Sequence, residues 1–307
     1  MAAVVAFCSS STGASAFSSM REPRPAPAGA SSPSVAPRQA VSFPATFVGV
    51  RDGRLAVFRS RDGSFARNLT DQPVDLGLPS VTPNRTKVFY VRVEPNACVA
   101  TYVVPLSGGE SRLARGGTHG GGQPIAAGPS GALAGNYACI ASMYIVAKAG
   151  NGQTYYISGT RDRGADGMAW APDAKHLAVS TITEGVLRLD VTADESLSEA
   201  RRVPCPALMA SCTTHAPSYA PSGTLYYVAV NAAATTAKVV RLVDGQARPV
   251  FTLPQVSAHF SLAAAAGGHV LVSGDADSST MTRSNFVVRW NGSRLVALRR
   301  AALQVDW

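Results

Sequence analysis

The segment Trp170-Ala171-Pro172-Asp173-Ala174-Lys175-His176-Leu177-Ala178-Val179 places a proline-containing turn directly before an apolar run. Turns of this kind, each followed by residues that favour β-strands, recur along the chain. Their phase markers are five prolines and, in the last copy, an alanine: Pro37, Pro83, Pro129, Pro172, Pro221 and Ala265. The spacings are 46, 46, 43, 49 and 44 residues. The chain therefore carries six copies of one unit with a steady period.

A second turn follows five of the six markers after 22 to 26 residues. It is a two-residue turn of the kind that accepts positive φ angles in a β-hairpin. The five dipeptides are Asp62-Gly63, Gly108-Gly109, Asn151-Gly152, Asp244-Gly245 and Asn291-Gly292. The fourth copy has a longer polar loop around Asp194 and Glu195 instead. Two turn signals in phase indicate several short strands in each copy.

Four short strands per roughly 45 residues are typical of one blade of a β-propeller. We predict an all-β fold, a six-bladed β-propeller, with five blades as the alternative. The first copy is the weakest, because residues 31–37 could be linker and not an innermost strand. Residues 303–307 offer another way to complete the first blade, by adding a strand that closes the ring.

The composition supports a folded domain behind a less structured N-terminus. Hydrophobic residues make up 46% of the chain and charged residues 15%, which excludes a chain that is disordered throughout, a coiled coil and a collagen-like chain. We interpret residues 1–33 as a signal-like remnant and a Ser/Ala/Pro-rich linker, and residues 34–307 as the propeller domain. No apolar run without a charge reaches the ~18 residues of a membrane-spanning helix.

The N-terminal apolar run ends at Cys8, which leaves two interpretations open. In the first, the run is the tail end of an export signal and Cys8 is a lipid anchor, giving peripheral attachment to a membrane. In the second, the N-terminus is disordered and Cys8 is incidental. The first interpretation predicts an extracytoplasmic protein, either in the cell envelope or secreted.

Four further cysteines allow three disulfide connectivities, and the sequence does not choose among them. Cys205 and Cys212 flank a loop of six residues, and Cys98 and Cys139 lie at comparable places in adjacent copies. An oxidising compartment would favour a bridge within each pair. The alternative is four buried thiols that behave as small hydrophobic groups.

The repeat phase also yields one candidate site. Six residues before each marker, the chain is expected to enter an innermost strand beside the central channel. These positions hold Ser31, Gly77, Gln123, Asp166, His215 and His259. The last four come from consecutive copies, and we predict that they converge at one mouth of the channel as ligands for a metal or an anionic small molecule. The alternative is that each polar side chain bonds to its own turn.

Motifs for catalysis and phosphate binding do not occur in the sequence. There is no nucleophile elbow, no phosphate-binding loop and no His-Glu-x-x-His. We therefore predict no catalytic residue, no cofactor and no structural metal. The net charge of +9 favours an anionic neighbour without selecting one, and without a recognised nucleic-acid-binding motif we expect no nucleic-acid partner.

One stretch carries a resemblance to a known family. Residues 78–91, Leu-Pro-Ser-Val-Thr-Pro-Asn-Arg-Thr-Lys-Val-Phe-Tyr-Val, resemble a WD40-like, TolB-type propeller blade, and the turn around Pro172 resembles the family's Ser-Pro-Asp-Gly pattern. The similarity is to TolB-like proteins of actinobacterial type and covers roughly residues 44 to 300. It implies an exported protein–protein interaction module. We therefore predict a non-enzymatic module that binds a protein or an envelope component, and we expect it to be a monomer. The alternative is a sensor or enzyme that uses Gln123, Asp166, His215 and His259.

Overall fold

A computed structural model describes residues 43–74, 76–93, 99–114, 121–137, 144–148, 154–157, 165–181, 183–191, 200–257, 259–275, 286–298 and 303–307. Residues Val41–Trp307 form one compact unit. Ser31, Cys8, Cys98 and Cys139 lie outside the described residues, as does the polar loop around Asp194. The predictions that rest on those residues stay predictions.

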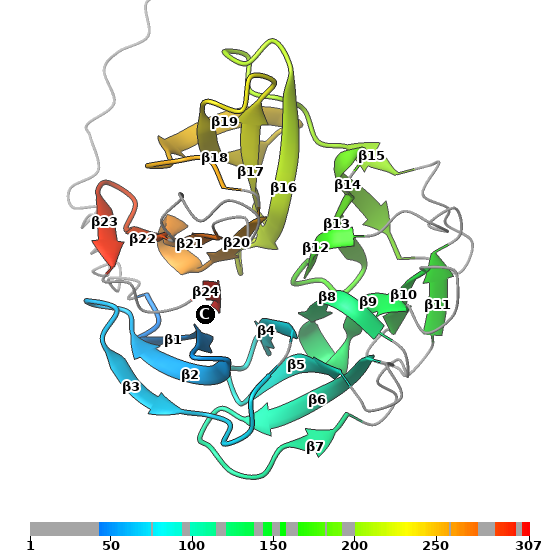
Figure 1. Cartoon of the computed structure of the whole chain (residues 1–307). Helices are drawn as coiled ribbons and strands as arrows, with labels where there is room; N and C mark the ends of the chain where they lie inside the picture. The colour runs from blue at the N-terminus through cyan, green and yellow to red at the C-terminus, as the bar shows by residue number, and fades with distance from the viewer. Residues whose placement is uncertain are drawn as a thin grey trace, which may run out of the picture. The chain divides into compact units, whose positions relative to one another are not determined.

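The described strands form six antiparallel sheets of four strands each, one for each copy of the repeat (Figure 1). The first sheet contains, in spatial order, β24 (Leu303–Asp306), β1 (Thr46–Arg51), β2 (Arg54–Arg59) and β3 (Phe65–Asn68). The second contains β4 (Leu76–Val81), β5 (Lys87–Val93), β6 (Val99–Pro105) and β7 (Arg112–Leu113). The third contains β8 (Gly121–Ala127), β9 (Leu133–Tyr137), β10 (Tyr144–Lys148) and β11 (Thr154–Ile157).

The remaining three sheets repeat the same up-and-down order. The fourth contains β12 (Ala165–Trp170), β13 (His176–Thr181), β14 (Gly185–Asp190) and β15 (Arg201–Arg202). The fifth contains β16 (Cys212–Tyr219), β17 (Leu225–Asn231), β18 (Ala237–Val243) and β19 (Gln246–Thr252). The sixth contains β20 (His259–Ala264), β21 (Val270–Asp275), β22 (Phe286–Trp290) and β23 (Leu295–Leu298). The predicted all-β propeller is confirmed.

Both turn signals of the sequence have a fixed place in the sheets where the structure describes them. From the second sheet to the sixth, the turns at the repeat markers join the innermost strand to the second strand, and two of them contain the short 3-10 turns Pro129–Gly131 and Ala266–Gly268. The described dipeptide turns join the third strand to the outermost one. Asp244 and Gly245, between β18 and β19, have φ angles of 51° and 75°, as a two-residue hairpin turn requires.

The hydrophobic core lies between neighbouring sheets. One cluster joins Val48 and Leu55 of the first sheet to Val88 and Val104 of the second, and these four side chains are fully buried. Comparable clusters lie between the third and fourth, the fourth and fifth, and the fifth and sixth sheets. The first, fourth, fifth and sixth sheets thus bury apolar side chains on both faces, as sheets in a ring without an open end do.

The ring closes through a strand from each end of the domain. The innermost strands pack against one another in a complete cycle, from β4 through β8, β12, β16 and β20 to β24 and back to β4. β24 pairs antiparallel with β1, with Val48 opposite Asp306 (Figure 1). The indole Nε1 of Trp307 donates to the carbonyl of Ala263 at 2.9 Å. Of the two ways to complete the first blade that the sequence allowed, the structure therefore has the closing strand within residues 303–307.

Within the part of the chain that the structure describes, no helix has the length and hydropathy of a membrane span.

Candidate functional site

The innermost strands enclose a cavity of about 510 Å³ in the channel of the ring. Residues of all six sheets line it, and so do the proline markers of the repeat, Pro83, Pro129, Pro172 and Pro221. We call the end of the cavity at these turns the turn mouth, and the end where β12, β16 and β20 begin the start end. The turns that mark the repeat in the sequence therefore also build one rim of the site.

Serine side chains brace neighbouring innermost strands across the cavity wall. Ser80 Oγ accepts from the Ala127 amide at 2.9 Å, and Ser218 Oγ accepts from the Ala264 amide at 3.0 Å. Ser261 Oγ donates to the Val305 carbonyl at 2.7 Å. These hydroxyls hold the strands in register, so the wall is preformed before any ligand arrives.

At the start end, the structure brings two predicted residues together. His215 Nδ1 lies 3.3 Å from Asp166 Oδ2, and its Nε2 lies 2.9 Å from the Thr213 hydroxyl. Burial of Asp166 acts to raise its pKa, but hydrogen bonds from His215 and Ser180 and the charge of His215 outweigh it, so the pKa lies below its usual value. Asp166 lines the cavity and is ionised at neutral pH.

His259 does not join this pair. It is exposed at the start of β20 and does not line the cavity. The pairing of β12 and of β16 shifts in register beside Asp166 and after His215, whereas β20 pairs residue by residue with β21 from His259 to Ala264. A β-bulge re-aims the side chains next to it, and β20 has none. Gln123 belongs to β8, but the structure does not describe its side chain.

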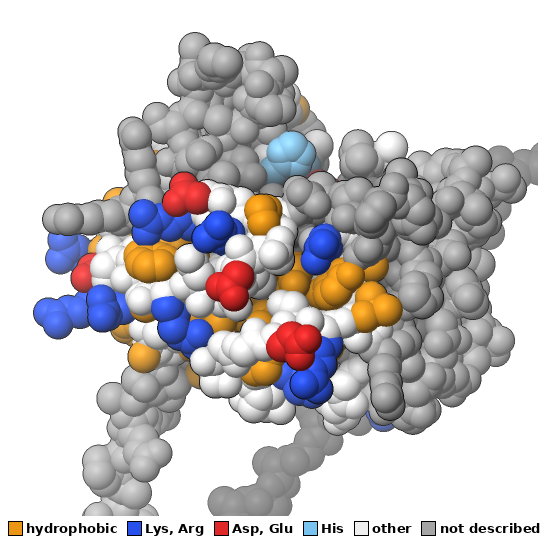
Figure 2. All heavy atoms as spheres, turned by 60° about the horizontal axis from the view of Figure 1, so that its bottom comes forward, with side chains coloured by type: hydrophobic (Ala, Val, Ile, Leu, Met, Phe, Trp, Pro, Cys, Tyr) orange, Lys and Arg blue, Asp and Glu red, His pale blue; other side chains and the backbone are white. Residues whose placement is uncertain are grey.

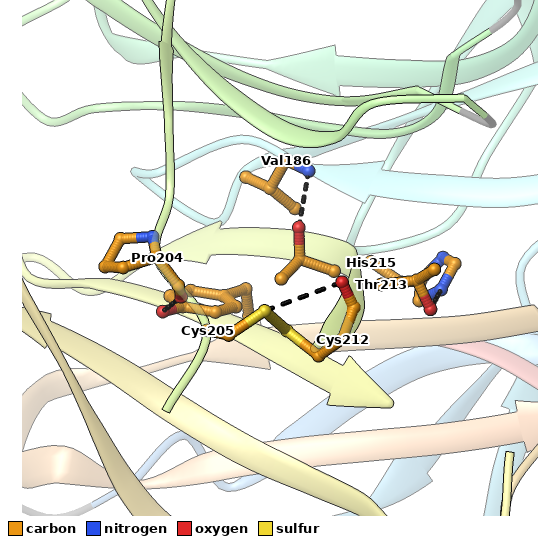
Figure 3. Close-up of a disulfide and its surroundings, with 8 residues drawn as sticks. Val186, Pro204, Cys205, Cys212, Thr213 and His215 are labelled. Atoms are coloured by element: carbon orange, nitrogen blue, oxygen red, sulfur yellow. Dashed lines mark hydrogen bonds between the residues drawn. A yellow bond between two sulfur atoms is a disulfide. The ribbon is translucent and has the colours of Figure 1, made fainter. Parts of the chain in front are cut away.

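A disulfide fixes the beginning of β16 and thereby the position of His215. Cys205 and Cys212 are bonded, with their Cα atoms 5.8 Å apart, which confirms one of the two predicted pairs. Figure 3 shows the bridge with Thr213 and His215 on the strand that follows it. The Tyr227 hydroxyl donates to the Pro204 carbonyl at 2.7 Å, so the segment before the bridge is tied to the same sheet.

At the turn mouth lies an arginine that the sequence analysis missed. Arg85 has a φ of 55°, in the left-handed region that favours glycine. The matching residues of the other turns are Gly131, Ala174, Gly223 and Gly267, with φ between 58° and 83°. A side chain there costs roughly 1 kcal/mol. The signal in the sequence was the arginine itself, at the third turn position where three other copies have glycine.

Only some of the hydrogen-bond donors of the Arg85 guanidinium have acceptors among the described residues. Its Nη2 donates to the Thr46 carbonyl at 2.8 Å. Its Nη1 is buried and has no hydrogen-bond acceptor among the described residues. Burial lowers the pKa of Arg85, and the charge of Asp306 partly offsets this effect. The side chain lines the cavity.

Asp306, the last residue of β24, lies at the same mouth. Its Oδ2 accepts from the Val81 amide at 2.7 Å, and its Oδ1 accepts from the Trp307 amide at 2.8 Å. Burial raises the pKa of Asp306 to about 6, although the two backbone hydrogen bonds and Arg85 act in the opposite direction. This carboxyl thus links the closing strand to β4.

The cavity wall combines a few charged groups with many apolar ones. Its charged wall groups are Arg85, Asp166 and Asp306, and the rest of the wall is mainly apolar. Among the described residues, no group of three His, Cys, Asp or Glu side chains is placed to hold a metal ion. The cavity volume falls in the range of about 300–1,000 Å³ that is usual for ligand sites.

The outer surface offers a mixed charge pattern. On the face in Figure 2, Lys and Arg side chains lie among Asp and Glu side chains. Ion pairs on the described surface include Arg51 with Asp52 at 3.3 Å and Arg112 with Glu110 at 3.7 Å. Exposed pairs of this kind contribute little to stability, and their mixture gives this face no dominant sign.

Comparison with solved structures supports the fold. Neither a protein-family model nor a curated protein matches the sequence. TolB from Acinetobacter baumannii is similar in structure, with a TM-score of 0.65 and 13% identity, covering 85% of this chain and 65% of that chain. A gluconolactonase from Xanthomonas campestris has a TM-score of 0.52 and 14% identity over 72% of this chain and 75% of its own.

An oligogalacturonate lyase in complex with manganese gives a TM-score of 0.52 and 15% identity, covering 80% of this chain and 70% of that one. At such identities the likeness shows the fold alone, and it confirms the predicted TolB-like propeller. The actinobacterial type stays a prediction. Because the similar structures include enzymes as well as TolB, the fold does not assign a function.

Proposed function

We propose that this protein is a non-enzymatic binding module that takes an extended peptide segment of a protein partner into its turn mouth. The observation that carries this proposal is the cavity itself, with its rim of prolines from four successive turns. Proline has a fixed φ and no backbone N–H, so this rim is rigid and apolar. A rigid rim loses little conformational entropy when a partner docks.

The lining favours an extended peptide over a folded surface. Aromatic side chains of Trp170, Tyr219, Phe260 and Trp307 stand in the wall. Aromatic-lined grooves are the usual receptors for extended, proline-containing segments, which lose little entropy on binding. The cavity is too narrow for a folded domain and large enough for a few residues of chain.

An extracytoplasmic location belongs to the same proposal. The Cys205–Cys212 disulfide is of a kind that persists in oxidising compartments and is rare in the cytosol. The TolB-like fold is in keeping with a place in the cell envelope. Attachment through Cys8 and a monomeric state stay predictions.

The proposal is tested by blocking the turn mouth. Ala266 lines the cavity in a partly exposed turn, so Ala266→Trp fills the mouth without entering the core. Wild-type and variant protein would be used to capture partners from the envelope fraction of the source cell, at low and high salt. We expect a protein captured by the wild type at both salt concentrations to be lost with Ala266→Trp.

The matched control is Ala207→Trp, an exposed position in the disulfide-closed loop. It adds the same side chain away from the turn mouth and should leave capture unchanged. Equal capture by all three proteins would refute binding at the turn mouth. Loss of all capture at high salt would mean that the net charge of +9 acts nonspecifically.

A small-molecule or metal-binding sensor is the second candidate, and the Asp166–His215 pair favours it. Under that hypothesis, His215→Ala abolishes binding of a small ligand or a divalent metal such as Mn²⁺, measured by calorimetry. Capture of a protein partner at the turn mouth would then be unaffected by His215→Ala.

A further inference from the structure

Arg85 adopts a backbone conformation that a glycine would adopt without strain, as Gly131, Gly223 and Gly267 do in the equivalent turns. A strained residue persists where its surroundings hold it in place, and such residues gather at functional sites. Among the described residues, the Arg85 side chain donates one hydrogen bond, from Nη2 to the Thr46 carbonyl, and it is attracted to Asp306.

The guanidinium therefore offers an unused donor at the cavity wall. Nη1 has no acceptor among the described residues, although it is buried. A buried donor without a partner costs free energy, and a ligand oxygen that reaches it removes this cost. Arg85 lines the cavity, and because Nη1 itself is buried, a ligand in the turn mouth reaches it when the Arg85 side chain turns toward the cavity.

The chemistry of the guanidinium selects the ligand group. Arginine only donates, stays charged and presents a planar fork that matches a carboxylate. The mainly apolar wall strengthens this attraction, because the local dielectric constant is lower than that of water. A phosphate fits less well. It carries nearly two negative charges, whereas Arg85 is the only cation in the described wall and Asp306 adds a negative charge beside it.

We infer that Arg85 anchors a carboxylate of the peptide that enters the turn mouth. This inference rests on the proposed function and adds the chemical identity of one anchor. The carboxylate can come from a C-terminus or from an Asp or Glu side chain, and the two sources share the same recognition by Arg85.

Three short peptides separate these sources. Acetyl-Pro-Pro-Ala with a free C-terminus carries a terminal carboxylate, and acetyl-Pro-Pro-Glu amide carries a side-chain carboxylate. Acetyl-Pro-Pro-Gln amide is the neutral isostere. Trp170 and Trp307 line the cavity, so their fluorescence reports binding directly. We expect at least one carboxylate peptide to bind about tenfold or more tightly than the neutral one, as a charge-assisted bond would give.

Variants of Arg85 then test the anchor. Arg85→Gly should remove the preference for carboxylate, while the protein stays folded because glycine suits the turn. Arg85→Lys keeps the charge but loses the planar fork, so it should retain only part of the preference. The matched control is Ala174→Gly, which relieves the same backbone conformation (φ 58°) in another turn. It should leave the preference intact.

The outcomes separate this inference from the function on which it rests. Equal binding of all three peptides, or a preference that survives Arg85→Gly, would overturn the carboxylate anchor. Failure of all three peptides to bind the wild type would overturn it too. The peptide-binding function stands or falls separately, on whether Ala266→Trp abolishes capture of a protein partner.

Discussion

The two ends of the channel each carry an aspartate, and the two carboxyls behave in opposite ways. Asp166 at the start end has a histidine beside it, and its pKa is lowered. Asp306 at the turn mouth accepts two backbone hydrogen bonds, yet burial raises its pKa to about 6. Two side chains of the same kind, on opposite walls of one cavity, therefore have different charge states under mildly acidic conditions.

The difference shows what stabilises a carboxylate in this ring. At the start end, His215 supplies a hydrogen bond and a charge within 3.3 Å. At the turn mouth, the only described cation that acts on Asp306 is Arg85, and no ion pair joins them within the described residues. Hydrogen bonds to backbone amides do not by themselves offset the loss of water. An ionised carboxyl is thus less well stabilised at the turn mouth, which we call the strained end, than at the start end. The turn mouth is also where the ring closes.

The largest effect is expected from removing the closing indole. Trp307 is 7% exposed, donates to the Ala263 carbonyl and packs near Phe43. Trp307→Ala should lower the free energy of unfolding by about 3–5 kcal/mol, because it leaves a cavity and an unpaired carbonyl. Urea denaturation measures this change.

Trp290 is the matched control for this prediction. It stacks on Phe251 with ring centroids 5.1 Å apart but is only half-buried. Trp290→Ala should therefore cost less than Trp307→Ala. An equal or larger loss from Trp290→Ala would show that ring closure at the turn mouth is not the critical contact.

The next effect is a pH dependence that comes from Asp306. Because the folded state holds this proton more tightly than the unfolded chain does, ionisation of Asp306 disfavours folding. The cost is absent below about pH 4, grows as the pH rises, and is complete above about pH 6. The raised pKa of about 6 makes it at most roughly 3 kcal/mol. Asp306→Asn should remove this fall in stability.

Measurements of the melting temperature at pH 4.5 and 7.5 compare the variant with the wild type. Other carboxyls, such as Asp62 and Asp173, have lowered pKa values and shift stability in the opposite direction. They are common to both proteins, so the difference between the two proteins isolates Asp306. If the two profiles run parallel, Asp306 is ionised without cost and the contrast between the two ends disappears.

Most of the fold could be predicted from local sequence. Each proline turn and each hairpin dipeptide depends on the φ angles of a few adjacent residues, so it can be recognised from the local sequence alone. The fixed spacing then indicates sheets that must bury two faces. Ring closure was harder to predict, because β24 pairs with β1 across almost the whole chain. Sequence spacing offered it only as an alternative to an innermost strand at residues 31–37.

The candidate site could be predicted in part. The repeat phase singled out Asp166 and His215, which the structure brings together, but it did not reveal that β20 lacks the register shift of β12 and β16, and His259 lies away from the pair. A register shift depends on pairing between strands, which a single sequence does not reveal. Arg85 and Asp306 were missed because 221 positions of chain separate them, and only the closed ring brings both to the turn mouth.

The smallest effect is expected at the start end, and its sign completes the comparison. Asp166 is 28% exposed as a side chain, so solvent screens its attraction to His215 and the pair contributes about 1 kcal/mol or less. A lowered pKa gives stability that is present above the unfolded value and is lost as the pH falls through the folded value. Asp166→Asn should therefore destabilise the protein at pH 7 and converge with the wild type in acid. Urea titrations at pH 7 and at the lowest pH at which the wild type still folds measure both limits.

Asp306→Asn, by contrast, changes stability mainly at neutral pH and in the favourable direction. If both substitutions were instead to shift stability in the same direction at pH 7, the two carboxyls would share one environment, and the turn mouth would lose its distinction as the strained end of the channel.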